Sequence, residues 1–264
     1  MSRADPFAFF RALKALGIEF AATDPAKAKD LHQRPRPLLR QLERQGFTVE
    51  TAKPSTQALR EFGFQVATVF DVGVDAGTPL IYDAFPDAKF VLIDPVLESR
   101  DRVSPWKEKI DFDFFVCGVG AAAGRMQINI PMRPGKTSLA RASLATFTDA
   151  NASMFTQFEQ RDVEIRTLDS IAQNYEGPFG LKIDTEGFEL EVIKGARAML
   201  TKCEFVIAEV SVKRRFANGY RFSQFIAEMG ESGFEPIDFL RPLRPDAVDC
   251  DVLFARYDSH RFDF

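Results

Sequence analysis

The sequence predicts an α/β protein built on a doubly wound, mostly parallel sheet. Five short apolar runs lack polar alternation, which is typical of strands buried on both faces of a parallel sheet. Helical segments separate several of these runs, as the right-handed crossovers of such a sheet require. The length of 264 residues, of which 45% are hydrophobic and 27% charged, fits one domain of this kind and excludes wholesale disorder.

The chain divides near residue 65. The apolar residues before that point have helical spacing, and the helices expected there span residues 7–16, 37–45 and 55–62. A basic run from Lys27 to Arg40 predicts a solvated face, with an anion-binding patch as the alternative. We therefore expect an N-terminal helical extension over residues 1–65 and the α/β domain over residues 66–264.

The patterning of the second part predicts its elements in order. The five apolar runs, expected to be parallel strands, are residues 67–72, 89–93, 112–116, 179–183 and 205–209. The helices expected between and after them are residues 79–85, 190–200 and 222–229. Residues 125–130 and 162–166 alternate as half-exposed strands do, and residues 233–237 and 251–255 are typical of a terminal antiparallel hairpin.

A turn containing two glycines follows the first strand, in the run Asp71-Val72-Gly73-Val74-Asp75-Ala76-Gly77-Thr78-Pro79. Glycine permits a tight turn and a close approach of the backbone to a ligand, and Thr78 and Pro79 are expected to cap and begin a helix. The spacing differs from the G-x-G-x-x-G of dinucleotide enzymes, and a pyrophosphate would meet two carboxylates. An amino acid carrying an ammonium and a carboxylate fits better, with a purely structural turn as the alternative.

The next two strands end in features that suit an adenosine. Asp94-Pro95 follows the second strand, 21 residues after Gly73, where this architecture binds the two hydroxyls of a ribose. The third strand ends in Val116-Cys117-Gly118-Val119-Gly120, whose small residues leave room for adenine. An adenosine joined to an amino acid is S-adenosylmethionine, which we therefore expect as the cofactor. A strand-ending role for Asp94 is the structural alternative.

Charged side chains gather where the fourth strand ends, in the run Lys182-Ile183-Asp184-Thr185-Glu186-Gly187-Phe188-Glu189. Glu209 ends the neighbouring fifth strand. The carboxyl ends of parallel strands form the crevice in which open α/β sheets bind ligands. Alternation places Lys182 and Asp184 on one side of the strand, where they can pair, since buried charge is costly unless it is paired or used. Capping of the following helix is the structural alternative for Asp184, Thr185 and Glu186.

The most specific resemblance to a known family lies in the run Leu181-Lys182-Ile183-Asp184-Thr185-Glu186-Gly187-Phe188-Glu189-Leu190-Glu191-Val192-Ile193-Lys194-Gly195-Ala196. This run resembles the signature of the FkbM-type S-adenosylmethionine-dependent methyltransferases. Further blocks match in the same order, at Val69 to Gly77, Asp94-Pro95, Arg166 to Ser170 and Val206 to Val210. The resemblance extends from about Val66 to Tyr257 and leaves the N-terminal helices outside it.

The resemblance implies a class I, Rossmann-like methyltransferase domain over residues 66–264 that methylates a hydroxyl of a sugar, a glycan or a small secondary metabolite. The positions expected at the cofactor are Asp71, Gly73, Val74, Asp75, Gly77, Asp94, Pro95, Gly118 and Val119. Those expected at the reaction centre are Lys182, Asp184, Glu186 and Glu209. The sequence departs from the family at Asp75, usually Asn, at Asp94, usually Glu, and after Val119-Gly120, where no acidic residue follows.

Methyl transfer from a sulfonium is an in-line displacement, so that alignment supplies much of the rate, while an alcohol needs help to lose its proton. Neither histidine lies near these motifs, which leaves a carboxylate or a lysine as the base. We predict Asp184 as the base, oriented by Lys182, with Glu186 or Glu209 holding the acceptor. No metal is required by this scheme; a Mg²⁺ held by Asp184 and Glu186 is the alternative.

Two other classes of function stay open at this point. One is an NAD-linked sugar-modifying oxidoreductase on a similar sheet, and the other is a non-catalytic ligand-binding or scaffold protein whose Phe-rich N-terminus is its interface. Residues 136–160, rich in Ser, Thr and Ala with Phe147, Phe155 and Phe158 among them, are expected to form either a lid over the site or a surface helix.

Composition limits the partners. With 34 Lys and Arg against 38 Asp and Glu, the net charge of -4 offers no broad cationic surface for a nucleic acid. The three cysteines, Cys117, Cys203 and Cys250, are expected to be buried and reduced. No apolar stretch approaches the ~20 residues of a membrane span, and the N-terminus lacks the layout of a secretory signal, so we expect a cytoplasmic protein. The 27 Phe predict spare aromatic anchors and a homodimer.

Overall fold

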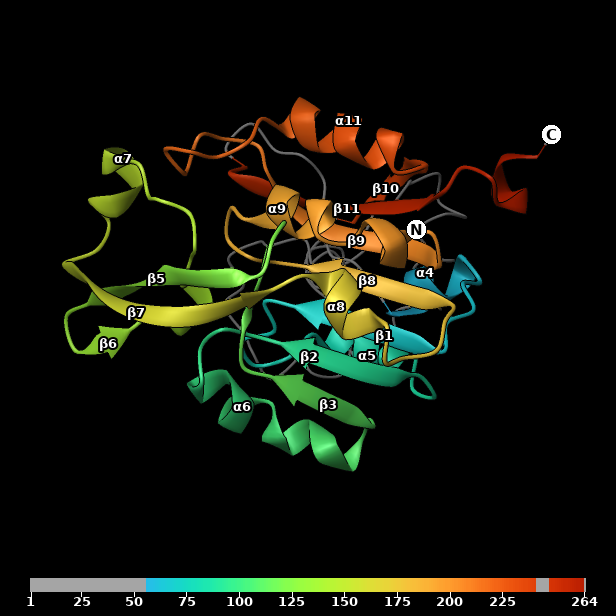
Figure 1. The fold of residues 1–264 in the computed structure, drawn as a ribbon, viewed down its shortest axis with the longest axis horizontal. Helices are drawn as coiled ribbons and strands as arrows, with labels where there is room; N and C mark the ends of the chain where they lie inside the picture. Colours follow the sequence, from blue (N-terminus) through green and yellow to red (C-terminus); the bar gives the residue numbers. More distant parts are fainter. Residues whose placement is uncertain (1–55, 241–246, 264) are drawn as a thin grey trace, which may run out of the picture. The chain divides into compact units, whose positions relative to one another are not determined.

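The computed structural model describes residues 56–240 and 247–263 (Figure 1). The helices expected over residues 7–16 and 37–45, and the basic run from Lys27 to Arg40, lie outside the described residues. The third expected helix is present as α4 (Thr56–Glu61). Within the described ranges no helix combines the length and the apolar character that a membrane crossing needs.

A seven-stranded sheet organises the described chain, in the order β10-β11-β9-β8-β1-β2-β3 (Figure 1). Its strands are β1 (Thr68–Val72), β2 (Lys89–Ile93), β3 (Phe112–Phe115), β8 (Phe179–Ile183), β9 (Cys203–Ser211), β10 (Phe234–Phe239) and β11 (Asp249–Arg256). The first five pair in parallel, whereas β11 is antiparallel to both β9 and β10. The predicted doubly wound sheet with a terminal antiparallel hairpin is confirmed.

Helices cover both faces of this sheet because alternate residues of its strands point to two separate cores. Phe70 and Val72 of β1 face one core and Val69 the other. The first core is closed by α8 (Leu168–Ala172), α9 (Glu189–Lys194), α10 (Arg197–Leu200) and α11 (Phe222–Glu231). The second is closed by α4, α5 (Pro79–Ala84) and the 3-10 helix η1 (Ser104–Glu108), with Val103 between α6 (Glu98–Arg102) and η1.

The helix expected over residues 190–200 is divided into α9 and α10 at Gly195. A Cβ at Gly195 would lie 2.1 Å from the carbonyl oxygen of Gly120, so the chain there passes directly against another backbone segment. The prediction of one continuous helix was wrong because periodicity alone does not reveal this close approach. The three cysteines are buried thiols, as expected.

A second sheet, in the order β4-β7-β5-β6, extends to one side of the first (Figure 1). Its strands are β4 (Gly118–Val119), β5 (Gly124–Arg133), β6 (Lys136–Thr137) and β7 (Gln157–Arg166). The two expected alternating strands are thereby confirmed as the antiparallel pair β5 and β7. Residues 136–160 contain β6, the 3-10 helix η2 (Leu139–Arg141), one turn of helix, α7 (Asp149–Ala152), and the start of β7.

Candidate active site

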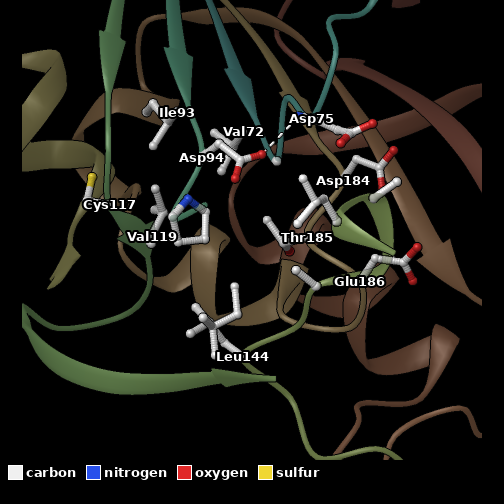
Figure 2. A pocket seen from close by; sticks show the side chains of 17 residues that line it. Val72, Asp75, Ile93, Asp94, Cys117, Val119, Leu144, Asp184, Thr185 and Glu186 are labelled. Carbon is white, nitrogen blue, oxygen red and sulfur yellow. Dashed lines mark hydrogen bonds between the residues drawn. The ribbon is translucent and has the colours of Figure 1, made fainter. Parts of the chain in front are cut away.

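A cavity of about 500 Å³, partly open to solvent, lies where β1, β2 and β8 end. Its polar and apolar parts are separated: Figure 2 shows Asp75, Asp184 and Glu186 on one side and Ile93, Cys117 and Val119 on the other. Residues 139–144 supply a further apolar wall through Leu139, Ala140, Ala142 and Leu144. The segment for which a lid or a surface helix was expected therefore borders the cavity directly.

Backbone geometry brings the β1 and β8 turns into contact. Gly73 has φ of +80°, and a Cβ placed there would lie 1.8 Å from the carbonyl oxygen of Asp184. Among the described residues two that are not glycine have positive φ, Asp75 at 46° and Glu186 at 52°, and both line the cavity. Sparsely populated backbone conformations persist where surrounding structure holds them, and they concentrate at functional sites.

Asp94 is the buried carboxylate of this cavity, with 6% of its surface exposed. One oxygen accepts the backbone N–H of Asp75 at 2.9 Å, drawn as the dashed line in Figure 2, and the other accepts the N–H of Val96 at 2.8 Å. Burial raises the pKa of Asp94 to about 6, although these hydrogen bonds oppose the shift. The Ser99 side chain also hydrogen-bonds this carboxylate, and the lone pairs that remain are those open to a ligand hydroxyl.

The structure brings six of the nine residues predicted at the cofactor to the cavity wall: Gly73, Asp75, Asp94, Pro95, Gly118 and Val119. It places the other three elsewhere. Asp71 lies beneath the turn, fully buried, and accepts the hydroxyl hydrogen of Tyr82 at 2.7 Å. Val74 belongs to the core beside α5, and Gly77 packs against Trp106, whose indole nitrogen a Cβ would approach to 2.4 Å.

The neighbouring helix start is partly as expected. Pro79 occupies the first turn of α5 and Thr78 the capping position, but the Thr78 side chain makes no capping hydrogen bond. The side chain instead interacts with Asp71, one of the contacts that oppose the burial-driven rise of the Asp71 pKa. Thr78 thus occupies the predicted capping position, but its side chain bonds to Asp71 and not to the helix backbone.

Of the residues predicted at the reaction centre, Asp184 and Glu186 line the cavity and Lys182 lies behind them. The Nζ of Lys182 is 3.3 Å from Oδ2 of Asp184, which confirms the predicted pair, and only 7% of the lysine side chain is exposed. The charges of Asp184, Asp251 and Glu209 raise the pKa of Lys182 against the opposing effect of burial, so the buried amine stays protonated.

Glu186 is held by two arginines. Arg215 forms a direct ion pair with it, and Nε of Arg141 lies 3.7 Å from its other oxygen. Burial raises the pKa of Glu186 to about 7, while Arg215 acts in the opposite direction. A carboxylate engaged in this way is a poorer ligand for the alternative Mg²⁺, because a cation would compete with both guanidinium groups.

Glu209 is set back from the cavity wall, and it also belongs to the network around Arg215. That guanidinium lies 3.9 Å from Glu209 and 3.0 Å from Asp249 on β11. Burial, with the nearby charges of Asp184 and Asp249, raises the pKa of Glu209. Arg215 was missed in the sequence, although the run Lys213-Arg214-Arg215 directly after β9 was a signal that could have identified it.

Glu189 was also missed as a structural residue of the loop after β8. One of its oxygens accepts the backbone N–H groups of Thr185 and Gly187 at 3.0 and 2.9 Å, and the other accepts the hydroxyl hydrogen of Tyr220 at 2.6 Å. The carboxylate thereby fixes the loop that carries Asp184 and Glu186. Phe188 occupies the capping position of α9 and no side chain caps that helix, so the capping alternative for Asp184, Thr185 and Glu186 was wrong.

The sequence profile described as the methyltransferase FkbM domain matches residues 71–236. Among solved structures, the magnesium protoporphyrin IX methyltransferase of Synechocystis PCC 6803 has a TM-score of 0.43 and 11% identity, covering 94% of this chain and 91% of that one. The N-methyltransferase NodS of Bradyrhizobium japonicum WM9 has a TM-score of 0.42 and 11% identity, covering 93% of this chain and 98% of that one. The 1,6-didemethyltoxoflavin N1-methyltransferase of Burkholderia thailandensis has a TM-score of 0.40 and 15% identity, covering 90% of this chain and 92% of that one. No curated protein matches by sequence.

Proposed function

The chain belongs to the FkbM methyltransferase family, and from this premise we propose that it methylates a hydroxyl group of a sugar, a glycan or a small secondary metabolite. Its cofactor is S-adenosylmethionine. Membership of this family favours methyl transfer over the NAD-linked oxidoreductase and the non-catalytic scaffold. Each of these two alternatives predicts a different experimental result.

The observation that carries the proposal is Asp94, a carboxylate buried at the cavity with one backbone amide on each oxygen. Its remaining lone pairs suit the two ribose hydroxyls of S-adenosylmethionine. The apolar wall formed by Ile93, Val119 and Leu144 suits the adenine ring. Gly118 packs closely behind it, because a Cβ there would lie 2.7 Å from Ile165 and 3.0 Å from Leu144. The residues present therefore fit the cofactor.

The charged end of the cavity suits the amino-acid part of the same molecule. Asp75 lines the cavity and pairs with Arg102 through Oδ1, so an ammonium group would share this carboxylate with Arg102. Gly73 presents backbone where a side chain would collide with Asp184. Asp75 replaces the asparagine usual in the family, and it keeps a hydrogen-bond acceptor at that position.

The cofactor supplies an electrophilic methyl group, and the protein supplies position and proton transfer. In our proposal Asp184, whose side chain is 37% exposed at the cavity, accepts the proton of the acceptor hydroxyl. Lys182 holds that carboxylate in place through its ion pair. Glu186, fixed by Arg215 and Arg141, accepts a hydrogen bond from the acceptor and orients it.

The test combines cofactor binding with turnover. S-adenosylmethionine at a hundredfold excess over its Kd should stabilise the protein by about 2.7 kcal/mol, measured as a rise in melting temperature. Incubation with unlabelled S-adenosylmethionine and a panel of hydroxylated acceptors should then give a product heavier by about 14 Da, because one methyl group replaces one hydrogen. No thermal shift would favour the scaffold, and a change in nicotinamide absorbance would favour the oxidoreductase.

Asp184→Asn separates binding from chemistry. We expect it to slow turnover by about 10²- to 10⁴-fold and to leave the Kd of S-adenosylhomocysteine unchanged. Asp87→Asn, which removes an exposed carboxylate between α5 and β2, is the matched control and should change neither quantity. Full turnover in Asp184→Asn would show that the base is a different group.

A further inference from the structure

A second cavity of about 780 Å³ lies beyond the β9 strand end, and its charge differs sharply from that of the first. Its described lining contains Lys213, Arg214, Arg215 and Arg221 and no Asp or Glu. We call this the basic cavity. Arg215 is paired with carboxylates outside this lining, so the positive charge that the cavity offers to a ligand comes from Arg214 and Arg221.

The two cavities share a wall. Glu186 lines the first cavity, and the next residue, Gly187, lines the basic cavity. Arg215 lines the basic cavity while its guanidinium binds Glu186. A ligand in the basic cavity therefore lies beside the wall that carries Glu186, the carboxylate proposed to orient the methyl acceptor.

The arginines of the basic cavity differ in burial and in their ion pairs. Arg215 is buried and is neutralised by Glu186 and Asp249, so its role is to hold the wall. Arg214 and Arg221 are exposed, and within the described ranges neither lies in an ion pair with an acidic side chain. The first turn of the ten-residue helix α11 also borders this cavity, through Phe222 and Gln224, and adds the positive end of a helix dipole.

We propose that the basic cavity binds an anionic group, a phosphate or a carboxylate, of the methyl acceptor. This inference rests on the proposed function, because it names the class of molecule that presents its hydroxyl to Asp184. Guanidinium groups bind both kinds of anion through paired hydrogen bonds. Phe216 and Tyr220 line the same cavity and give the remainder of such an acceptor an apolar surface to contact.

The test uses pyrophosphate as the phosphate probe, citrate as the carboxylate probe and erythritol as a neutral polyol, each titrated calorimetrically into the full chain at about 25 mM salt. At least one anion should bind at least tenfold more tightly than erythritol. The double variant Arg214→Gln/Arg221→Gln should weaken that binding at least tenfold, because it removes two cations from the cavity. Arg100→Gln/Arg125→Gln, with the same change in net charge at two exposed positions outside the cavity lining, is the control and should bind as the wild type does.

Saturating S-adenosylhomocysteine should leave anion binding unchanged, because the two ligands occupy different cavities. Competition between them, failure of both anions to bind, or equal affinity in the double variant and the wild type would overturn the inference. Titration of S-adenosylhomocysteine alone separates this outcome from failure of the proposed function. If that ligand binds and the anions do not, only the inference fails; if that ligand does not bind, the proposed function fails.

Discussion

The two sides of the first cavity are built by different means. On the cofactor side, formed by Gly73, Asp75 and Asp94 at the ends of β1 and β2, a carboxylate is held by backbone amides within a short span of sequence. On the charged side, formed by Asp184, Glu186 and Arg215 after β8 and β9, side chains hold one another by ion pairs, one between neighbouring positions (Lys182–Asp184) and one between residues 29 positions apart (Arg215–Glu186). The first kind of site depends on backbone conformation, and the second depends on charge compensation.

The largest effect should come from breaking the backbone contact that joins the two sides. Gly73→Ala places a Cβ 1.8 Å from the Asp184 carbonyl oxygen at φ of +80°, where neither backbone segment can yield without moving its strand. We expect a loss of about 5 kcal/mol in the free energy of unfolding, measured by urea denaturation, and loss of S-adenosylhomocysteine binding.

The matched control is Gly63→Ala. Gly63 also has positive φ, at 67°, but a Cβ there would meet no atom within 4 Å. It should cost only the backbone strain, about 1 to 2 kcal/mol. Equal losses for the two variants would mean that strain alone, and not the contact between the β1 and β8 turns, matters at Gly73.

The charged side should be most sensitive at its central cation. Arg215→Gln leaves Glu186 and Asp249 partly buried without the guanidinium that compensates them, and we expect a loss of about 3 kcal/mol in the free energy of unfolding. The double variant Arg215→Gln/Glu186→Gln should recover part of this loss, because it removes one of the stranded charges. Urea denaturation of the four proteins of this cycle gives the coupling energy, and a coupling near zero would contradict an ion-pair network.

The contrast between the two sides also explains what the sequence could reveal. The apolar strands, the terminal hairpin and Asp94 were predictable because each depends on a local pattern, such as a buried run or a carboxylate at a fixed distance from a glycine turn. The pair Lys182–Asp184 was predictable from alternation along one strand. Arg215 and Glu186 are 29 positions apart, and no local pattern indicates that they meet.

Three of the residues predicted at the cofactor lie away from the cavity wall for a related reason. Asp71, Val74 and Gly77 lie in the same motif as Gly73 and Asp75, but strand alternation and the tight turn direct them into the protein. Trp106 is the partner of Gly77, and it lies in a 3-10 helix that the sequence patterning did not predict. A motif therefore locates a turn more reliably than it assigns each of its side chains to a ligand.

The cofactor side should show a dependence on pH that comes from one residue. Burial raises the pKa of Asp94 to about 6, and ribose hydroxyls donate hydrogen bonds to the ionised form. Below pH 6 the ligand must displace a proton, so the affinity for S-adenosylhomocysteine should fall toward tenfold per pH unit and stay level above pH 7. Calorimetry at pH 5 to 8 measures this slope. Asp94→Asn should bind more weakly and lose the slope, whereas Asp87→Asn should keep it.

The smallest effect should come from an arginine–carboxylate pair on the cofactor side, which tests whether the sensitivity of the charged side is due to burial. Arg102 forms an ion pair with Asp75, but its side chain is 39% exposed, against 7% for Arg215. Water already screens this pair, so Arg102→Gln should lower the free energy of unfolding by about 0.2 to 1 kcal/mol, and less at high salt. Urea denaturation of Arg102→Gln beside Arg215→Gln makes the comparison with the same substitution. A loss as large as that of Arg215→Gln would show that the cofactor side also depends on charge compensation, and the proposed division between the two sides would be wrong.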